Sequence, residues 1–168
     1  MDDFREYVAV RGPGLLRSAV LLTGDRGHAE DLVQTALIRV HARWGRIRDR
    51  EAVDAYVRRA MLTTYLNWWR RRWRGEVPTE VLPDRAEAGG YERVETRLPL
   101  AQALTRLPPR MRAVVVLRYF DDLPDAEIAA LLGCSAATVR SQAHRALAKL
   151  REDGALADLA PTERRTER

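Results

Sequence analysis

Residues 125–151 read DAEIAALLGCSAATVRSQAHRALAKLR, and this stretch restricts the possible fold more than any other part of the chain. Pro124 and Asp125 suit the first turn of a helix, where a missing N–H is tolerated and a carboxylate meets the positive end of the helix dipole. Gly133 ends that helix because glycine adopts positive φ easily, and Ser135 is a good N-cap for the next helix. The pattern predicts two helices joined by a tight turn.

The spacing of Ala129, Gly133 and Val139 is that of a helix-turn-helix, in which the small residue allows close approach and the valine anchors the second helix. At 100° per residue, one face of the second helix is apolar and the other holds small residues, hydrogen-bond donors and arginine. Such an exposed face suits a DNA major groove. The alternative is a plain helical hairpin with a solvated arginine face. The predicted DNA-facing residues are Ser135, Ala137, Thr138, Arg140, Ser141, His144 and Arg145.

Positive charge is concentrated in two parts of the 168-residue chain, whose net charge is +5. Residues 36–75 hold eleven basic and three acidic side chains, a net +8, and residues 101–150 hold seven and four, a net +3. Between them, residues 76–100 hold three basic and six acidic side chains, a net −3. Two basic blocks with an acidic spacer indicate two contacts with a polyanion such as nucleic acid. The alternative is that the charge only confers solubility.

Helical periodicity dominates the whole chain, so the predicted fold is all-α. The segment after residue 74 is rich in proline, glycine and acidic residues, which is typical of a flexible linker. We therefore expect two small helical domains, at 1–74 and 96–153, joined by a linker at 75–95 and followed by a polar tail at 154–168. The predicted helices lie near 2–22, 28–45, 51–73, 97–106, 109–120, 125–132 and 136–152.

Residues 64–74 read TYLNWWRRRWR and place tryptophans beside arginines. On a helix these side chains separate by angle, and Trp68 joins the face predicted to enter the core. Trp69 and Trp73 fall in a neighbouring apolar sector, which packs on other helices or stacks on unpaired bases. The remaining side forms a polar strip that can hold phosphates. The residues of this strip are Arg59, Thr63, Asn67, Arg70 and Arg74.

The predicted helix at 28–45 has an apolar face and an opposite face that carries Asp31, Gln34, Thr35 and Ile38. An isoleucine on the side that faces water indicates a protein partner, although a single exposed isoleucine is common.

The sequence offers no signature of an enzyme. It has no glycine-rich phosphate loop, no cluster of metal ligands and no nucleophile motif, so we expect neither catalysis nor a metal or cofactor. The single cysteine, Cys134, excludes an internal disulfide. No apolar run could span a membrane, and the start of the chain does not read as a signal peptide, so the expected location is the cytoplasm.

Three stretches together are similar to a known family: AEDLVQTALIRVHARW, AYVRRAMLTTYLNWWRRRWR, and the segment from LPPRMRAVVVLRYFDDLPDAEIAALLG through the second helix of the motif. In this order they resemble the extracytoplasmic-function sigma factors of bacteria, most of all an actinobacterial SigE-like subgroup. The resemblance covers about residues 4–152. It implies a non-catalytic subunit that binds core RNA polymerase and promoter DNA. An ordinary helix-turn-helix regulator is the alternative, but it would need a dimerisation or ligand domain.

The resemblance also assigns roles by position. Residues 1–74 would be region 2 and residues 96–153 region 4. Glu30, Asp31 and Gln34, with Thr35 and Ile38 on the same face, would meet the β′ clamp helices of the polymerase, and region 4 would meet the β flap. The polar strip would melt and read the −10 element, and the helix-turn-helix would read the −35 element. Many relatives have asparagine in place of Thr63, which bears on the −10 base that is captured. An anti-sigma factor is a further candidate partner.

Overall fold

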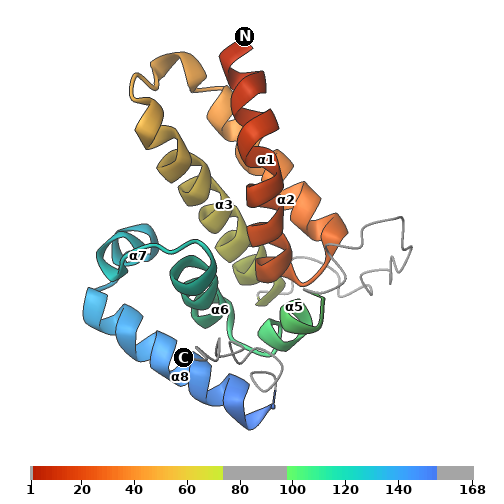
Figure 1. Cartoon of the computed structure of the whole chain (residues 1–168), viewed down its shortest axis with the longest axis vertical. Coiled ribbons are helices and arrows are strands. Elements are labelled where there is room, and N and C mark those ends of the chain that lie inside the picture. The colour runs from red at the N-terminus through yellow and green to blue at the C-terminus, as the bar shows by residue number, and fades with distance from the viewer. Residues whose placement is uncertain (1, 74–97, 155–168) are drawn as a thin grey trace, which may run out of the picture.

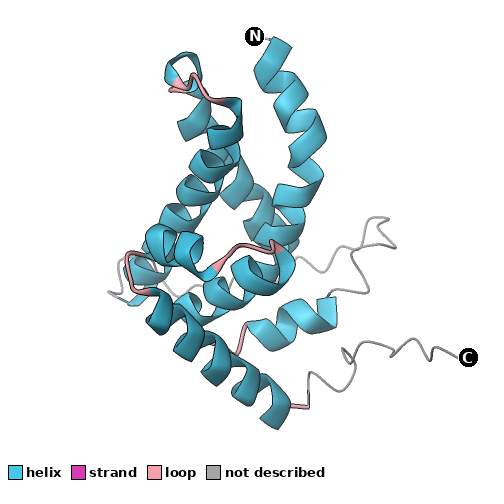
Figure 2. Ribbon diagram, turned by 60° about the vertical axis from the view of Figure 1, so that its left-hand side comes forward, coloured by secondary structure: helices cyan, strands magenta, loops and turns pink. Residues whose placement is uncertain are grey.

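The computed structural model describes residues 2–73 and 98–154, and every regular element within these two ranges is a helix (Figure 1). The loops between the described helices are short, as Figure 2 shows. The prediction of an all-α fold with two helical units is confirmed. The predicted linker lies outside the described residues, and so does almost all of the predicted tail, so the proposed domain boundaries stay a prediction. None of the described helices is long and apolar enough to cross a membrane.

The N-terminal unit has three long helices: α1 (Asp2–Thr23), α2 (Arg26–His41) and α3 (Arg50–Trp73), with a 3₁₀ turn η1 (Trp44–Arg46) before α3. Helix α2 packs against both α1 and α3. It begins two residues earlier than predicted because the carboxylate of Asp25 caps it by accepting from the His28 amide at 2.9 Å. It ends four residues earlier because the chain tightens into η1, where the Trp44 ring packs on Phe4 and Tyr7 of α1.

The C-terminal unit comprises α5 (Leu98–Leu104), α6 (Pro109–Val115), a π-helical turn η2 (Val116–Phe120), α7 (Asp125–Leu132) and α8 (Ala136–Glu152). The predicted helix at 109–120 is thus α6 continued by a π turn, in which the Asp121 amide bonds to the Val116 carbonyl at 3.0 Å. Helices α7 and α8 form the predicted helix-turn-helix. Gly133 has φ of +67°, as a left-handed helix end requires.

The two units share one hydrophobic core. Helices α5, α6 and η2 pack on α1, and α6 and α7 pack on α3. Figure 1 shows α5 and α6 beside the ends of α1 and α3, with α8 on the far side of α6. Leu21, Leu62 and Tyr65 of the N-terminal unit belong to the same buried cluster as Leu117 and Ile128 of the C-terminal unit. The described helices therefore form one packed body.

Candidate nucleic-acid interface

Helix α8 has the two faces that the sequence predicts. Its apolar face is buried: Val139 and Ala146 are 0% exposed. On the opposite face, the predicted DNA-facing residues that belong to α8 are all exposed, namely Ala137, Thr138, Arg140, Ser141, His144 and Arg145. Ser135, which caps the helix, is exposed as well. The periodicity of one helix fixes this orientation, because every third or fourth residue returns to the buried side.

Part of the α8 face stabilises the motif itself. The Ser135 hydroxyl accepts from the Thr138 amide at 3.1 Å and lies 2.9 Å from the Thr138 hydroxyl, which is the geometry of an N-cap. Arg140 lies 3.9 Å from Asp125 of α7. Arg145, in contrast, makes no ion pair with any described residue, so its five donors are available to an external acceptor. An exposed arginine whose donors are unpaired can bond to a base edge.

The structure describes four of the five residues of the predicted polar strip on α3, and three of them are exposed. Arg59, Thr63 and Arg70 are exposed and Asn67 is half-buried, whereas Arg74 lies outside the described residues. Arg59 and Arg70 make no ion pair with described side chains, and no carboxylate within the described part of α3 neutralises the strip between them. A helix face with unopposed guanidinium groups attracts phosphates, because each contact releases counterions.

Trp68 and Trp69 lie at the edge of the core, which corrects the prediction for Trp68. Trp68 is half-buried rather than enclosed, because the last turns of α3 lie at the end of the three-helix packing. Trp69 is also half-buried, and its ring meets Tyr65 edge-on with 6.5 Å between centroids. The guanidinium groups of Arg112 and Arg72 lie 5.4 and 5.5 Å from the Trp69 ring centroid.

The predicted partner face on α2 is exposed and forms one wall of a groove. Glu30, Asp31, Gln34 and Ile38 are exposed, Ile38 to 65%, and Thr35 is half-buried. The groove has a volume of about 770 Å³. Its other wall comes from α1, through Phe4, Arg5, Val8, Gly12 and Leu16. The sequence did not indicate this second wall, since only the packing of α1 on α2 places it there.

Arg112 is the residue that sequence reasoning most clearly missed. It is 1% exposed. Its guanidinium donates to three backbone carbonyls: Leu22 at 2.6 Å, Thr105 at 2.8 Å and Leu107 at 3.2 Å. Burial lowers the pKa of Arg112, with nearby Tyr65 acting in the opposite direction. The available signal is an arginine within an otherwise apolar stretch, residues 111–117, where a solvated charge would not fit.

Across the described residues, no three histidine, cysteine, aspartate or glutamate side chains gather in a way that could hold a metal ion. The site therefore consists of two arginine-bearing faces, on α3 and α8, and a mixed groove between α1 and α2. Faces with exposed arginines can bind phosphates and base edges, and an apolar groove with a polar rim can bind a protein segment.

Family models match both helical units of the chain. A family model described as Sigma-70 region 2 matches residues 9–75, and one described as Sigma-70, region 4 matches residues 97–150. The chain is 48% identical to a protein named RNA polymerase sigma-E factor from Streptomyces avermitilis, over 90% of this chain and 84% of the relative. It is 32% identical to the ECF RNA polymerase sigma factor SigE from Mycolicibacterium smegmatis, over 90% of this chain and 62% of the relative.

Two solved structures are similar in fold. The sigma factor RpoE in complex with the anti-sigma factor NepR from Bartonella quintana has a TM-score of 0.70 and 23% identity, over 90% of this chain and 96% of that one. CnrH in complex with the cytosolic domain of CnrY has a TM-score of 0.60 and 25% identity, over 94% and 88%. The arrangement of helices described above is therefore shared with proteins of distant sequence.

Proposed function

Since this chain belongs to the sigma-70 family of RNA polymerase sigma factors, and is of the extracytoplasmic-function type, we propose that its three exposed faces divide the work of promoter recognition. Region 4, helices α5 to α8, reads the −35 element through α8. Region 2, helices α1 to α3, reads and melts the −10 element through α3, and it binds core polymerase through the groove between α1 and α2. The observation that carries this proposal is the presence of two separate exposed faces, one on each region: Arg59 and Arg70 on α3 and Arg145 on α8 make no ion pair with described residues.

At the −35 element, α8 enters the major groove with its exposed face, from Ala137 to Arg145, toward the bases. Arg145 supplies a forked donor that fits the two acceptors of a guanine edge, a contact worth about 1–3 kcal/mol of discrimination. Ala137 and Ser141 are small, so they allow the helix backbone to approach the bases closely. The capping bond between Ser135 and Thr138 holds the first turn rigid, which fixes the angle at which the helix meets DNA.

At the −10 element, the α3 strip combines two kinds of contact. Arg59 and Arg70 bind phosphates and contribute affinity that is independent of sequence. Thr63 and Asn67 are short and polar, so they can select a base only at direct contact. Under this proposal, base preference at −10 depends on these two residues and on the neighbouring loop, and the arginines position the strand.

Core polymerase binds the α1–α2 groove. The exposed Ile38 and the apolar floor given by Val8, Leu16 and Leu37 suit a helical segment of the partner, while Asp31 and Gln34 at the rim select its polar groups. Catalysis of RNA synthesis belongs to core polymerase, so this chain acts as a specificity subunit in the cytoplasm. An anti-sigma factor is part of the proposal as a further partner, since the structurally similar sigma factor from Bartonella quintana is held in a complex with one.

The proposal is tested at the groove with the double variant Gln34→Ala and Ile38→Glu. We expect weaker binding to core polymerase, because a glutamate desolvated in the interface without a partner costs about 1–3 kcal/mol. The helical circular dichroism spectrum should not change, since both side chains are exposed in the free chain. The matched control is Val10→Glu, an exposed apolar residue of α1 (71%) that does not line the groove. Wild-type affinity in the double variant would contradict the placement of the polymerase there. Failure of the wild-type chain to co-purify with core polymerase would favour a regulator that acts without being a polymerase subunit.

A further inference from the structure

Thr64 is a buried polar side chain among apolar neighbours. It is 2% exposed and shares the face of α3 that packs against α2 with Val53, Val57 and Met61, all of them buried. Within the described residues, only Thr64 and Arg112 are buried polar side chains. Because a buried hydroxyl is unfavourable unless it is hydrogen-bonded, the partners of Thr64 indicate what a threonine does at this position.

The Thr64 hydroxyl has two partners, one on each of the two helices. Its Oγ1 donates to the carbonyl of Ala60, one turn earlier in α3, at 2.8 Å. A hydroxyl has a single proton, so an oxygen whose proton is engaged in this way can only accept a second bond. Arg39 of α2 supplies that bond, with its Nη1 at 3.1 Å from the Thr64 Oγ1. The buried threonine therefore fixes the position of an arginine that comes from the neighbouring helix.

Arg39 keeps most of its capacity to bind an external group. Its side chain is exposed, it makes no ion pair with any described residue, and residues 32–48 contain no acidic side chain. A guanidinium has five donors, and the bond to Thr64 uses one of them. Arg39 does not line the groove between α1 and α2. Its remaining donors are therefore available at the boundary of α2 and α3, apart from the proposed polymerase site.

This boundary adjoins the part of α3 that is proposed to select the −10 base. At 100° per residue, the exposed side of α3 is crossed in an order that ends at the α2 boundary: Arg59, Arg70, Thr63, Asn67 and Thr64. The two short polar residues therefore have arginines of α3 on one side and Arg39 of α2 on the other. Positive charge on both sides suits a single strand, whose phosphates flank each base.

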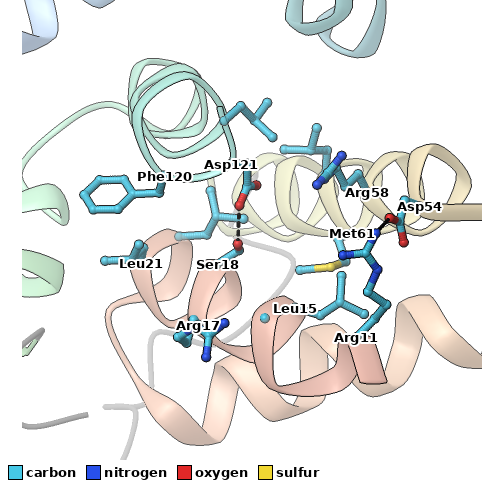
Figure 3. A pocket seen from close by; sticks show the side chains of 14 residues that line it. Arg11, Leu15, Arg17, Ser18, Leu21, Asp54, Arg58, Met61, Phe120 and Asp121 are labelled. Carbon is cyan, nitrogen blue, oxygen red and sulfur yellow. Dashed lines mark hydrogen bonds and ion pairs between the residues drawn. The ribbon is translucent and has the colours of Figure 1, made fainter. Parts of the chain in front are cut away.

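Arg58 is oriented differently, although it is the sequence neighbour of Arg59. It lies on the opposite side of α3, where it lines the cavity shown in Figure 3 with Arg17 of α1 and Asp121. Burial raises the pKa of Asp121, and the nearby charge of Arg58 acts to lower it. The arginines around α3 thus fall into separate groups, and Arg17 is an exposed arginine outside the strip.

We propose that Arg39 is a further contact to the melted −10 strand and that Thr64 is the residue that positions it. The inference rests on the proposed function of α3. It adds a phosphate contact from α2 beside Thr63 and Asn67. It also gives the buried hydroxyl of Thr64 a role in promoter binding that a residue acting only in packing would not have.

The test measures binding of the holoenzyme to a promoter whose −10 region is already unpaired, at several salt concentrations. The variants are Arg39→Ala, Thr64→Val, the two together, and Thr64→Ser, which keeps the hydroxyl. Arg17→Ala is the matched control, because it removes an exposed arginine on the other side of α3 from the strip. Affinity for core polymerase and Tm are measured on the same chains.

We expect Arg39→Ala to weaken binding about tenfold and to lower the slope of log affinity against log salt concentration by roughly 0.7, the value for one phosphate of a single strand. Arg17→Ala and Thr64→Ser should leave both quantities close to wild type, and no variant should lose affinity for core polymerase. Thr64→Val keeps the charge of Arg39 but not its position. It should therefore weaken binding in the wild-type background and change little once Arg39 is alanine.

Three results would overturn the inference. An unchanged salt slope in Arg39→Ala would leave the bond to Thr64 as a link between two helices and nothing more. Loss of affinity for core polymerase in Arg39→Ala would place the residue at the other interface. Equal losses from Thr64→Val with and without Arg39 would remove the positioning role. If Arg70→Ala also binds the unpaired template like the wild type, the proposed function of α3 fails, and the inference fails with it.

Discussion

Replacing Arg112 by methionine should destabilise the folded chain substantially, even though the substitution removes a buried charge. Methionine is long, flexible and apolar, so it fills much of the space. It cannot donate, however, to the carbonyls of Leu22, Thr105 and Leu107, which the guanidinium now satisfies. The variant therefore separates the packing of the side chain from its hydrogen bonds.

The magnitude follows from two opposing effects. Each orphaned carbonyl costs about 1 kcal/mol or more, and loss of the contact with Trp69 adds about 0.5–1 kcal/mol. Against this, burying the guanidinium is itself unfavourable, as its lowered pKa shows, and its Nε has no hydrogen-bond partner among the described residues. We expect a net loss of about 3 kcal/mol. For a chain of this size, each kcal/mol corresponds to roughly 2–4 °C, so Tm should fall by roughly 6–12 °C.

The assay is thermal and urea unfolding followed by far-ultraviolet circular dichroism, which reports on the helices of both regions. Arg106→Met is the matched control, because Arg106 is an exposed arginine of the same segment whose ion pair with Asp153 is long, at 3.6 Å. It should change stability by less than about 1 kcal/mol. Arg112→Lys should fall between methionine and wild type, since an ammonium cannot reach three carbonyls in the geometry of a planar fork.

A methionine variant as stable as the wild type, or more stable, would refute this reasoning. It would mean that the desolvation of the guanidinium outweighs its three bonds, as happens for some buried ion pairs. A loss in Arg106→Met equal to that in Arg112→Met would show that general charge, and not the buried contacts, determines the effect.

Three further predictions concern DNA binding and pH. Arg145→Ala should weaken binding to a duplex −35 element, and a promoter already unpaired at −10 should not restore activity; full restoration would contradict the assignment of α8. Arg70→Ala should weaken binding to all promoters alike and reduce the slope of log affinity against log salt concentration by roughly 0.7–0.9. Asn67→Ala should instead change which −10 sequence is preferred, and open-complex formation on a panel of −10 variants measures this. Asp121→Asn should stabilise the fold relative to wild type at neutral pH, because burial raises the pKa of Asp121 above its ordinary 3.8 and disfavours the carboxylate. That advantage should shrink as pH falls through this pKa, where the wild type takes up its proton; a difference that grows on acidification in urea melts would show the opposite sign.

The sequence by itself determined the helices and the helix-turn-helix. Caps, turns and helical periodicity act within a few residues, so Gly133 and Ser135 place the turn wherever the motif sits in the molecule. For the same reason the sequence indicated the exposed side of α8 and the exposed positions Arg59, Thr63 and Arg70 of the α3 strip, whereas Asn67 is half-buried. Two features, the early end of α2, where Trp44 packs on α1, and the π turn after α6, were not predicted.

Only the tertiary structure decided how the regions meet and what the aromatic side chains do. A single sequence does not reveal that Arg112 reaches the end of α1, ninety residues away, or that Ser18 bonds to Asp121. Periodicity assigned Trp68 to the core, but the face of a helix says nothing about where along its length the neighbouring helices end. Angular position is a local property of one helix, whereas burial depends on what packs against it.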